Sequence, residues 1–145
     1  MAKWKVAVIG CGMFANANYF PNISKVADAE CVAACDIIPE RAEASAKRFG
    51  IPNYYKNVYE LLEKCDFDIA IDAASIPAHH EINMAVLKAG KHLITQKPAA
   101  LTVEDMDLQI ETAKKAGVKF SSVPIHMIRP DIKMALQMIK DGAIG

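Results

Sequence analysis

Two glycines and one small residue near the N-terminus have the spacing of a phosphate-binding turn. Gly10, Gly12 and Ala15 form the pattern GxGxxA directly after an apolar run. Glycines in a tight turn let the backbone approach a pyrophosphate closely, and the N-terminus of a following helix directs free N–H groups at the phosphates. Met13 and Phe14 lie inside the pattern and are candidates for the same contact. The pattern predicts a dinucleotide site, although the same spacing also occurs in plain turns.

A carboxylate follows at the distance at which such a site needs one. Asp36 comes directly after a second apolar run, residues 31–35, and can accept hydrogen bonds from the ribose of adenosine, with Ile37 beside it. A negative charge there favours NAD over NADP, because it would repel the 2′-phosphate of NADP. Arg41 lies one turn into the next expected helix, so it either reaches a 2′-phosphate or remains a solvated arginine on a helix face. The sequence therefore predicts NAD as the cofactor and keeps NADP possible.

Lys97 is the residue best placed for catalysis. It follows the apolar run 92–95, and ligands of parallel sheets bind at the carboxyl ends of strands. Beside an oxidised nicotinamide ring the lysine would feel a positive charge, which favours its neutral form, and it could then hydrogen-bond a substrate hydroxyl and share its proton. The same position also suits a solvated surface lysine. Pro98 restricts the turn, and a cis peptide bond before it would direct the lysine into the cleft.

Further polar residues stand at other strand ends. His79 and His80 come after the turn that contains Ser75, a candidate cofactor contact. Consecutive residues of a helix point about 100° apart, so only one histidine should face the cleft, and we expect it to be His80. His92 lies at the opposite end of its strand and is predicted to be structural. The segment 124–129 follows the last strand and adds candidates at the same edge of the sheet.

Alternating strands and helices must position these residues. Strands are expected at residues 6–9, 31–35, 54–55, 68–74, 92–95 and 118–123. Helices are expected at residues 14–26, 39–49, 58–64, 75–90, 102–117 and 130–140. Pro21 should break the first helix near Tyr19, and Thr102 should cap the fifth. Short loops between alternating elements indicate right-handed βαβ units, so the fold class is α/β: a doubly wound parallel sheet, the Rossmann fold, in a single domain over residues 1–145.

The composition excludes several classes of partner. The 145 residues suit one domain, and 17 basic residues balance 17 acidic ones, so nucleic acid is not an expected partner. No apolar run is long enough to cross a bilayer, and no leader precedes the first strand, so we expect a cytoplasmic protein without a membrane partner. The four cysteines form no CxxC pair, and we expect reduced structural thiols and no metal site.

Four stretches resemble the N-terminal domain of one enzyme family. They are VAVIGCGMFA, the strand end at Asp36 with IIPERAEASAKRFGI after it, AGKHLITQKPAALTVEDM, and the closing IKDGAIG. Together they are similar to the glucose-fructose oxidoreductase, inositol dehydrogenase and rhizopine-catabolism (Gfo/Idh/MocA) family over nearly the whole chain. The most specific stretch, AGKHLITQKPAALT, is similar to the family block AGKHVxxEKPxAxT.

The resemblance implies an oxidoreductase that moves hydride between NAD(P) and a secondary alcohol of a sugar, cyclitol or related polyol. By the same resemblance, Lys97 contacts substrate near the nicotinamide, Pro98 is its motif partner, and His80 follows the family's TPxxxH-like turn. The family has a second α/β domain, which this chain lacks and which supplies most of the substrate pocket and the oligomer interface. We therefore expect a homo-oligomer for the full-length protein, and cofactor binding with little turnover for this chain.

Two departures from the family pattern keep alternatives open. Gln96 replaces the motif glutamate, which removes a negative charge beside Lys97, and Ser75-Ile76 stands where Thr-Pro is usual. The first departure and the missing domain favour a non-catalytic dinucleotide sensor as the main alternative. A third hypothesis keeps the fold but assigns S-adenosylmethionine or another adenine ligand to the site.

Overall fold

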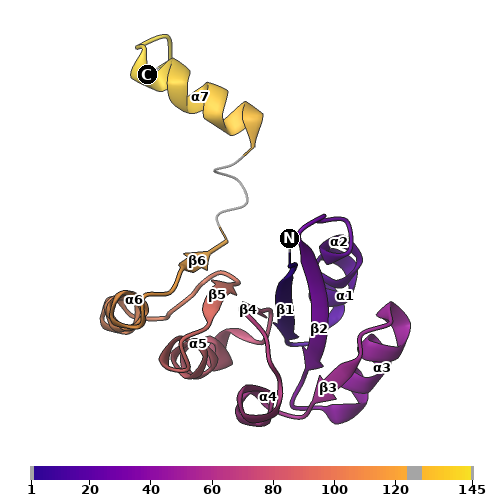
Figure 1. Ribbon diagram of the computed structural model, residues 1–145. Coiled ribbons are helices and arrows are strands. Elements are labelled where there is room, and N and C mark those ends of the chain that lie inside the picture. The colour runs from indigo at the N-terminus through magenta and orange to yellow at the C-terminus, as the bar shows by residue number, and fades with distance from the viewer. Residues whose placement is uncertain (1, 124–128, 145) are drawn as a thin grey trace.

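Parallel strands form one six-stranded sheet at the centre of the computed structural model, which describes residues 2–123 and 129–144 (Figure 1). The strands are β1 (Trp4–Ile9), β2 (Ala29–Cys35), β3 (Asn53–Tyr55), β4 (Ile69–Asp72), β5 (His92–Thr95) and β6 (Phe120–Ser122). Their order across the sheet is β3-β2-β1-β4-β5-β6. The direction of the strand order therefore reverses between β1 and β4, which is where sheets of this kind bind their ligands.

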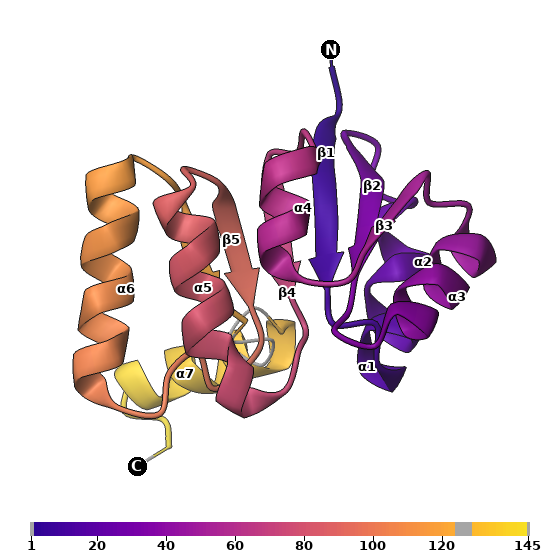
Figure 2. The same ribbon diagram turned by 90° about the horizontal axis from the view of Figure 1, so that it is seen from below.

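Helices cover both faces of the sheet (Figure 2). They are α1 (Met13–Asn18), α2 (Phe20–Ile23), α3 (Pro39–Phe49), α4 (Val58–Lys64), the short 3-10 helix η1 (Ile76–Ala78), α5 (His79–Lys88), α6 (Val103–Ala116) and α7 (Pro130–Lys140). One apolar core joins the sheet to α1, α2 and α3, and a second joins the opposite face to α4, α5 and α6. The doubly wound α/β sheet predicted from the sequence is confirmed.

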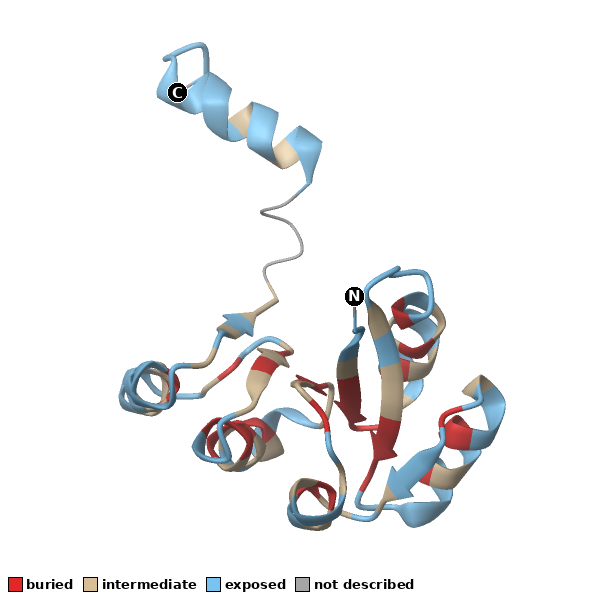
Figure 3. Ribbon diagram, viewed as in Figure 1, coloured by how far each residue is buried: buried red, intermediate tan, exposed pale blue. Residues whose placement is uncertain are grey.

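Strand β1 shows how the sequence supplies both cores. Val6 and Val8 are buried in the core beneath α1 to α3, and Ala7 and Ile9 are buried in the core beneath α4 to α6. Successive side chains of a strand point to opposite faces, so a continuous apolar run serves two layers of helices at once. Figure 3 shows the buried residues gathered in the central strands and on the inner sides of the helices.

The first helical region breaks where the sequence predicts. α1 ends at Asn18 and α2 begins at Phe20, with Tyr19 between them. Pro21 lies in the first turn of α2, where its missing N–H group leaves no hydrogen bond unmade. The predicted helix over 14–26 is therefore two short helices, and the second ends at Ile23.

The turn after β4 departs in the same way from the single helix expected over residues 75–90. Ala78 N donates to Ser75 O at 2.9 Å, which closes a tight 3-10 turn before α5 begins at His79. Pro77 lies in that turn. Helix α5 therefore begins at His79, with His80 as its second residue.

Thr102 caps α6 as expected. Its hydroxyl oxygen accepts a hydrogen bond from Asp105 N at 3.1 Å, and Gly117 ends the helix with a φ of 69°. Replacing Thr102 by alanine should lower the free energy of unfolding by about 1 kcal/mol, because the N–H of Asp105 loses its partner. Denaturant unfolding measures the change. Thr102→Ser keeps the hydroxyl and should stay close to the wild type; an equal loss in both variants would contradict the cap.

Helix α7 stands apart from the sheet in Figure 1. It occupies the predicted bounds, but none of its residues is buried, and Met134 is 64% exposed and Ile139 50%. The exposed apolar side chains form a surface that the core of this chain does not cover. The candidate segment 124–129 lies mostly outside the described residues, which resume at Arg129.

Candidate functional site

The turn between β1 and α1 packs directly on the turn that follows β4. Gly10 has a φ of 92°, and a Cβ atom there would lie 2.5 Å from Ala74 N and 2.6 Å from Ala73 C. Gly10 N also donates to Cys35 O at 2.7 Å. Only glycine fits this position, because both the backbone conformation and the space exclude a side chain. The turn is therefore fixed against the ends of both neighbouring strands, β2 and β4.

Gly12 faces open space, unlike Gly10. No atom lies within 4 Å of a Cβ atom placed on Gly12, and Gly12 is the N-cap of α1. Ala15, the third small residue of the pattern, is fully buried beneath the turn. The two glycines thus have different roles. Gly10 allows the turn to pack against Ala73 and Ala74, and Gly12 leaves the backbone accessible to a bound group. This open cradle fits a pyrophosphate.

The Asp36 carboxylate organises the other side of the turn. Its Oδ2 accepts a hydrogen bond from Cys11 N at 2.8 Å, and its Oδ1 accepts one from Ile38 N at 2.9 Å. Asp36 is only 8% exposed. Because each carboxylate oxygen can accept two hydrogen bonds, one site on each oxygen remains for a ligand hydroxyl pair. The geometry fits a ribose.

A cavity of about 410 Å³ joins these groups. It opens at the carboxyl ends of β1, β2 and β4 and reaches the first turns of α4 and α5. Most of the residues predicted to bind cofactor line it: Gly10, Gly12, Met13, Phe14, Asp36, Ile37, Arg41 and Ser75. The structure therefore brings together residues that lie up to 65 positions apart in the sequence.

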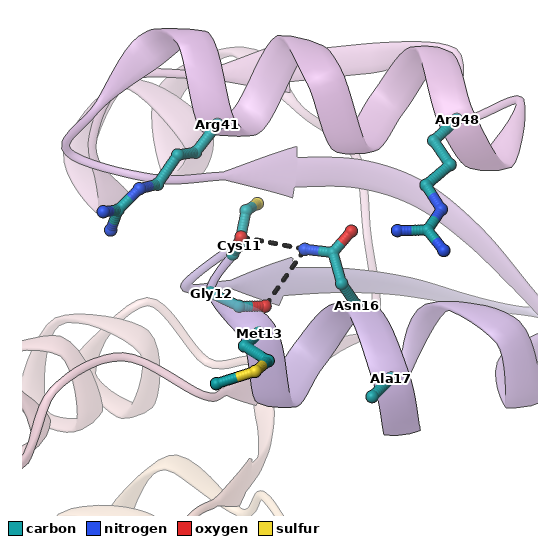
Figure 4. A pocket seen from close by; sticks show the side chains of 7 residues that line it. All are labelled: Cys11, Gly12, Met13, Asn16, Ala17, Arg41 and Arg48. Carbon is teal, nitrogen blue, oxygen red and sulfur yellow. Dashed lines mark hydrogen bonds between the residues drawn. The ribbon is translucent and has the colours of Figure 1, made fainter.

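A second hollow, of about 450 Å³, lies between α1 and α3 on the other side of the glycine turn (Figure 4). Arg41 and Arg48 both line it, and Figure 4 shows their guanidinium groups at its two ends. The side-chain nitrogen of Asn16 donates to Cys11 O at 2.8 Å, to Gly12 O at 3.0 Å and to Ser45 Oγ at 3.1 Å. These bonds hold α1, the turn and α3 together.

Sequence reasoning missed Arg48 and Asn16. Arg48 lies seven residues after Arg41, which is two helical turns, so the spacing itself places both on one face of α3. That signal was present in the sequence. The contact of Asn16 with Ser45 depends on how α1 packs against α3, and no pattern in the sequence predicts it.

Lys97 lies outside both cavities. It is exposed at the carboxyl end of β5, and the Lys97–Pro98 peptide bond is cis. Gln96 beside it donates from its side-chain nitrogen to the hydroxyl of Tyr19, and its backbone N donates to Asp72 O at 2.9 Å. Gln96, which replaces the motif glutamate, thus ties the end of β5 to the break between α1 and α2.

The expectation that His80 faces the cleft stays a prediction, and in the structure His80 contacts α6. His80 lines neither cavity; its Nδ1 lies 3.5 Å from Asp105 Oδ1 and 3.4 Å from Gln109 Nε2, both on α6. The other histidine, His79, is only 1% exposed. The 3-10 turn Ile76–Ala78 precedes α5, and at the start of that helix His79 lies in the core while His80 lies beside α6.

A buried polar cluster at the end of β4 surrounds His79. Its Nδ1 lies 2.6 Å from Asp72 Oδ2, and Thr95 Oγ1 donates to the same oxygen at 3.4 Å. Asp72 Oδ1 accepts from Ala74 N at 2.9 Å. Asp72 and Thr95 are fully buried. The Asp72–His79 pair therefore anchors the turn on which Gly10 packs. The sequence did not indicate this pair, because an aspartate at the end of an apolar run does not show which residue it will contact.

The cysteines are buried or partly buried thiols in the described part of the chain. Burial raises the pKa of Cys11, Cys31 and Cys35 to about 12, so these thiols stay protonated at neutral pH. All four cysteines are free. Within residues 2–123 and 129–144, no three His, Cys, Asp or Glu side chains gather as metal ligands would. His92 accepts a hydrogen bond from Lys119 N at 3.0 Å, far from the cavities.

Membrane insertion through a helix finds no support in the described part of the chain. None of the helices there combines the length and the apolar character that crossing a bilayer requires.

Comparisons with known proteins identify one oxidoreductase family and several similar dehydrogenases. Residues 4–123 match the family described as an oxidoreductase family with an NAD-binding Rossmann fold. D-apiose dehydrogenase of Paraburkholderia graminis is 32% identical over 143 residues, which cover 99% of this chain and 38% of that protein. Inositol 2-dehydrogenase/D-chiro-inositol 3-dehydrogenase of Lactiplantibacillus plantarum is 32% identical over 145 residues, which cover 97% of this chain and 41% of that protein.

Solved structures share the fold. An oxidoreductase from Agrobacterium radiobacter, crystallised with NAD+, L-tartaric acid and magnesium, superposes with a TM-score of 0.89 at 26% identity, over 99% of this chain and 42% of that one. The chain thus spans about two fifths of the length of the relatives that it matches.

Proposed function

The chain belongs to the oxidoreductase family with the NAD-binding Rossmann fold, and we propose that it is the cofactor domain of an enzyme that transfers hydride between NAD and a secondary alcohol of a sugar, cyclitol or related polyol. The observation that carries the proposal is the cavity that joins the open glycine turn to the Asp36 carboxylate. The names of the relatives, which are dehydrogenases of apiose and inositols, support the substrate class.

Each group of residues has a part in binding. The backbone at Gly10 and Gly12 would face the pyrophosphate, with Met13, Phe14 and the buried Ala15 shaping the start of α1. Asp36 would accept the ribose hydroxyls, and Ile37 and Ser75 would contact the cofactor from opposite sides of the cavity. The nicotinamide ring, when bound, supplies the acceptor for hydride. The chain's own residues orient that ring and hold it at the edge of the sheet.

Lys97 is proposed to meet the substrate rather than the adenosine half of the cofactor. It is exposed at the carboxyl end of β5, on the far side of the β1–β4 reversal from Asp36. A lysine there can donate a hydrogen bond to a substrate hydroxyl and pass a proton to solvent. His80 is not part of this proposal, because it contacts α6.

Asp36 and the two arginines of α3 act in opposite directions on cofactor choice. Asp36 repels a 2′-phosphate, whereas Arg41 and Arg48 place positive charge beside the same turn. Because Asp36 is fixed by two backbone hydrogen bonds and Arg41 is exposed, we propose a preference for NAD with measurable binding of NADP.

Asp36→Ala should weaken NAD binding and reverse the preference. Loss of hydrogen bonds to a charged acceptor should raise the Kd for NAD about tenfold or more, while NADP loses less because the repulsion disappears with the carboxylate. Calorimetric titration with NAD and NADP, each in both redox states, measures the two constants.

The matched control for this titration is Asp36→Asn. It keeps an oxygen for one of the two N–H donors and removes the charge, so the melting temperature should fall less than in Asp36→Ala while discrimination against NADP is lost. An unchanged ratio of the two Kd values in both variants would remove Asp36 from the site. A folded wild type that binds neither dinucleotide would overturn the proposed function.

A dinucleotide sensor is the second candidate function. Gln96 in place of the motif glutamate and the position of Lys97 outside both cavities favour it. A sensor binds NAD and shows no hydride transfer when the protein is tested with a panel of polyols, whereas the enzyme produces NADH. S-adenosylmethionine, added as a competitor, should not displace NAD.

The surface of α7 suggests where further polypeptide is bound. Its exposed apolar side chains, Met134 and Ile139 among them, form an uncovered apolar surface of the kind that marks contacts with other polypeptide. We propose that α7 packs against protein, either further chain of the same enzyme or a second copy in a homo-oligomer. Light scattering over a range of concentrations reports the second case.

A further inference from the structure

We propose that Glu81, held in place by Tyr59, recognises the exocyclic amino group of the cofactor's adenine. The inference rests on the proposed function, since it assigns a specificity determinant within the same cavity. It concerns residues of α4 and α5 that line the cavity and that the sequence did not single out.

The position of Asp36 decides where the adenine must lie. The base is attached to the ribose that Asp36 is proposed to hold, so it occupies the part of the cavity beyond that carboxylate and away from the β1–β4 reversal. That part is walled by Ile37 and Ile38 after β2, by Val58 of α4, and by Ile82 of α5. Apolar side chains on both sides suit a flat aromatic base.

Few polar groups stand at this apolar end. Besides Asp36 and Arg41 at the ribose, the cavity is lined here by Asn57, Tyr59 and Glu81. A small number of placed polar groups in a largely apolar cavity is what fixes the orientation of a ligand. These three residues therefore decide which base edge the cavity accepts.

Glu81 presents a carboxylate with one oxygen engaged. The Tyr59 hydroxyl donates to Glu81 Oε1 at 2.8 Å. That hydrogen bond is the largest cause that raises the pKa of Tyr59, so the phenol keeps its proton and donates it. Among the residues that the structure describes, none donates a hydrogen bond to the second oxygen, Oε2. An acceptor that the Tyr59 hydroxyl orients is thus left at the exposed rim of the cavity.

Asn57 contributes the complementary group. Its Oδ1 accepts a hydrogen bond from Glu60 N at 2.8 Å, as the N-cap of α4, so the amide oxygen is engaged and the NH2 group is the part of the amide that can donate to a ligand. The edge of adenine carries an amino donor between ring nitrogen acceptors. A carboxylate and an NH2 group that line the same cavity can match that alternation of donor and acceptor.

Hypoxanthine provides the test because it differs from adenine at this edge alone. It has a carbonyl oxygen in place of the amino group and a proton on the neighbouring N1, so donor and acceptor are exchanged along this edge. The Glu81 carboxylate then faces the carbonyl oxygen, which it repels, and the Asn57 NH2 group faces the N1–H donor. A site built to hydrogen-bond one group discriminates strongly against an analogue that lacks it. We expect the wild type to bind NAD about tenfold more tightly than nicotinamide hypoxanthine dinucleotide, as measured by calorimetric titration of each.

Glu81→Gln should remove that preference. The glutamine keeps the Tyr59 hydroxyl as a partner and can turn its NH2 group to the carbonyl of hypoxanthine, so the ratio of the two Kd values should fall to about threefold or less. Tyr59→Phe keeps the carboxylate and loses its tether, so it should reduce the ratio only in part. Glu63→Gln, an exposed change of the same charge on α4 outside the cavity, should leave the ratio unchanged.

The outcomes separate this inference from the proposed function. Tight NAD binding with equal affinity for the hypoxanthine analogue would overturn the role of Glu81 and leave the cofactor site standing. The same holds if Glu81→Gln keeps the preference of the wild type. Absence of NAD binding in a folded wild type would overturn both.

Discussion

Gly10→Ala is expected to abolish detectable NAD binding and to lower the free energy of unfolding by about 2 to 5 kcal/mol. The new Cβ atom would lie 2.5 Å from Ala74 N and 2.7 Å from Ala73 O, and neither backbone atom can move without displacing the turn after β4. The φ of 92° adds strain that a residue with a side chain rarely tolerates. Denaturant unfolding and calorimetric titration with NAD measure the two effects.

Gly12→Ala separates packing from binding in the same turn. Its φ of −72° suits any residue, and no atom lies within 4 Å of the added Cβ. We therefore expect a change in stability of less than about 1 kcal/mol, together with weaker NAD binding, because the Cβ occupies the space proposed for the pyrophosphate. Wild-type stability in Gly10→Ala, or wild-type affinity in Gly12→Ala, would contradict the division of duties between the two glycines.

His79→Leu should destabilise the protein by about 3 to 5 kcal/mol, since it leaves the Asp72 carboxylate buried without its strongest partner. His79 Nδ1 and Asp72 Oδ2 lie 2.6 Å apart, and both residues are buried. Once the imidazole is removed, Thr95 Oγ1 and Ala74 N are the described hydrogen-bond donors that Asp72 keeps. Urea unfolding at neutral pH gives the value.

Two companion variants show whether the loss comes from the buried charge. The double variant Asp72→Asn/His79→Leu removes the charge together with the imidazole and should recover a large part of the stability. His80→Leu changes the neighbouring, half-exposed histidine and should cost less than about 1 kcal/mol. A double variant less stable than His79→Leu would show that the carboxylate is satisfied without the histidine.

These variants can also change NAD binding, because a series of contacts links the polar cluster around His79 to the glycine turn. Asp72 holds Ala74 N, and the turn at Ala74 is the surface on which Gly10 packs. His79 therefore stabilises the phosphate-binding turn without touching the cavity. We expect its replacement to weaken NAD binding only as far as the turn loosens.

The sequence by itself determined the fold and pointed to the glycine turn and Asp36, which line one cavity. Gly10, Gly12 and Asp36 follow strand ends at a spacing that depends only on the local chain, and the structure confirms that they share one cavity. Helix bounds such as Val58–Lys64 and Pro130–Lys140 also follow from local signals, because caps, prolines and apolar periodicity act within a few residues. The parallel sheet with helices on both faces follows from the alternation of strands and helices with short connections.

Only the tertiary structure decided which polar side chains meet. His79 and His80 have the same local sequence signal, and the packing of α5 against β4 and α6 places the first beside Asp72 and the second beside α6. Tyr59 and Glu81 lie 22 residues apart on different helices, and their contact depends on how α4 and α5 pack. Such contacts arise from the packing of whole elements on the sheet, and that packing leaves no pattern within the segments themselves.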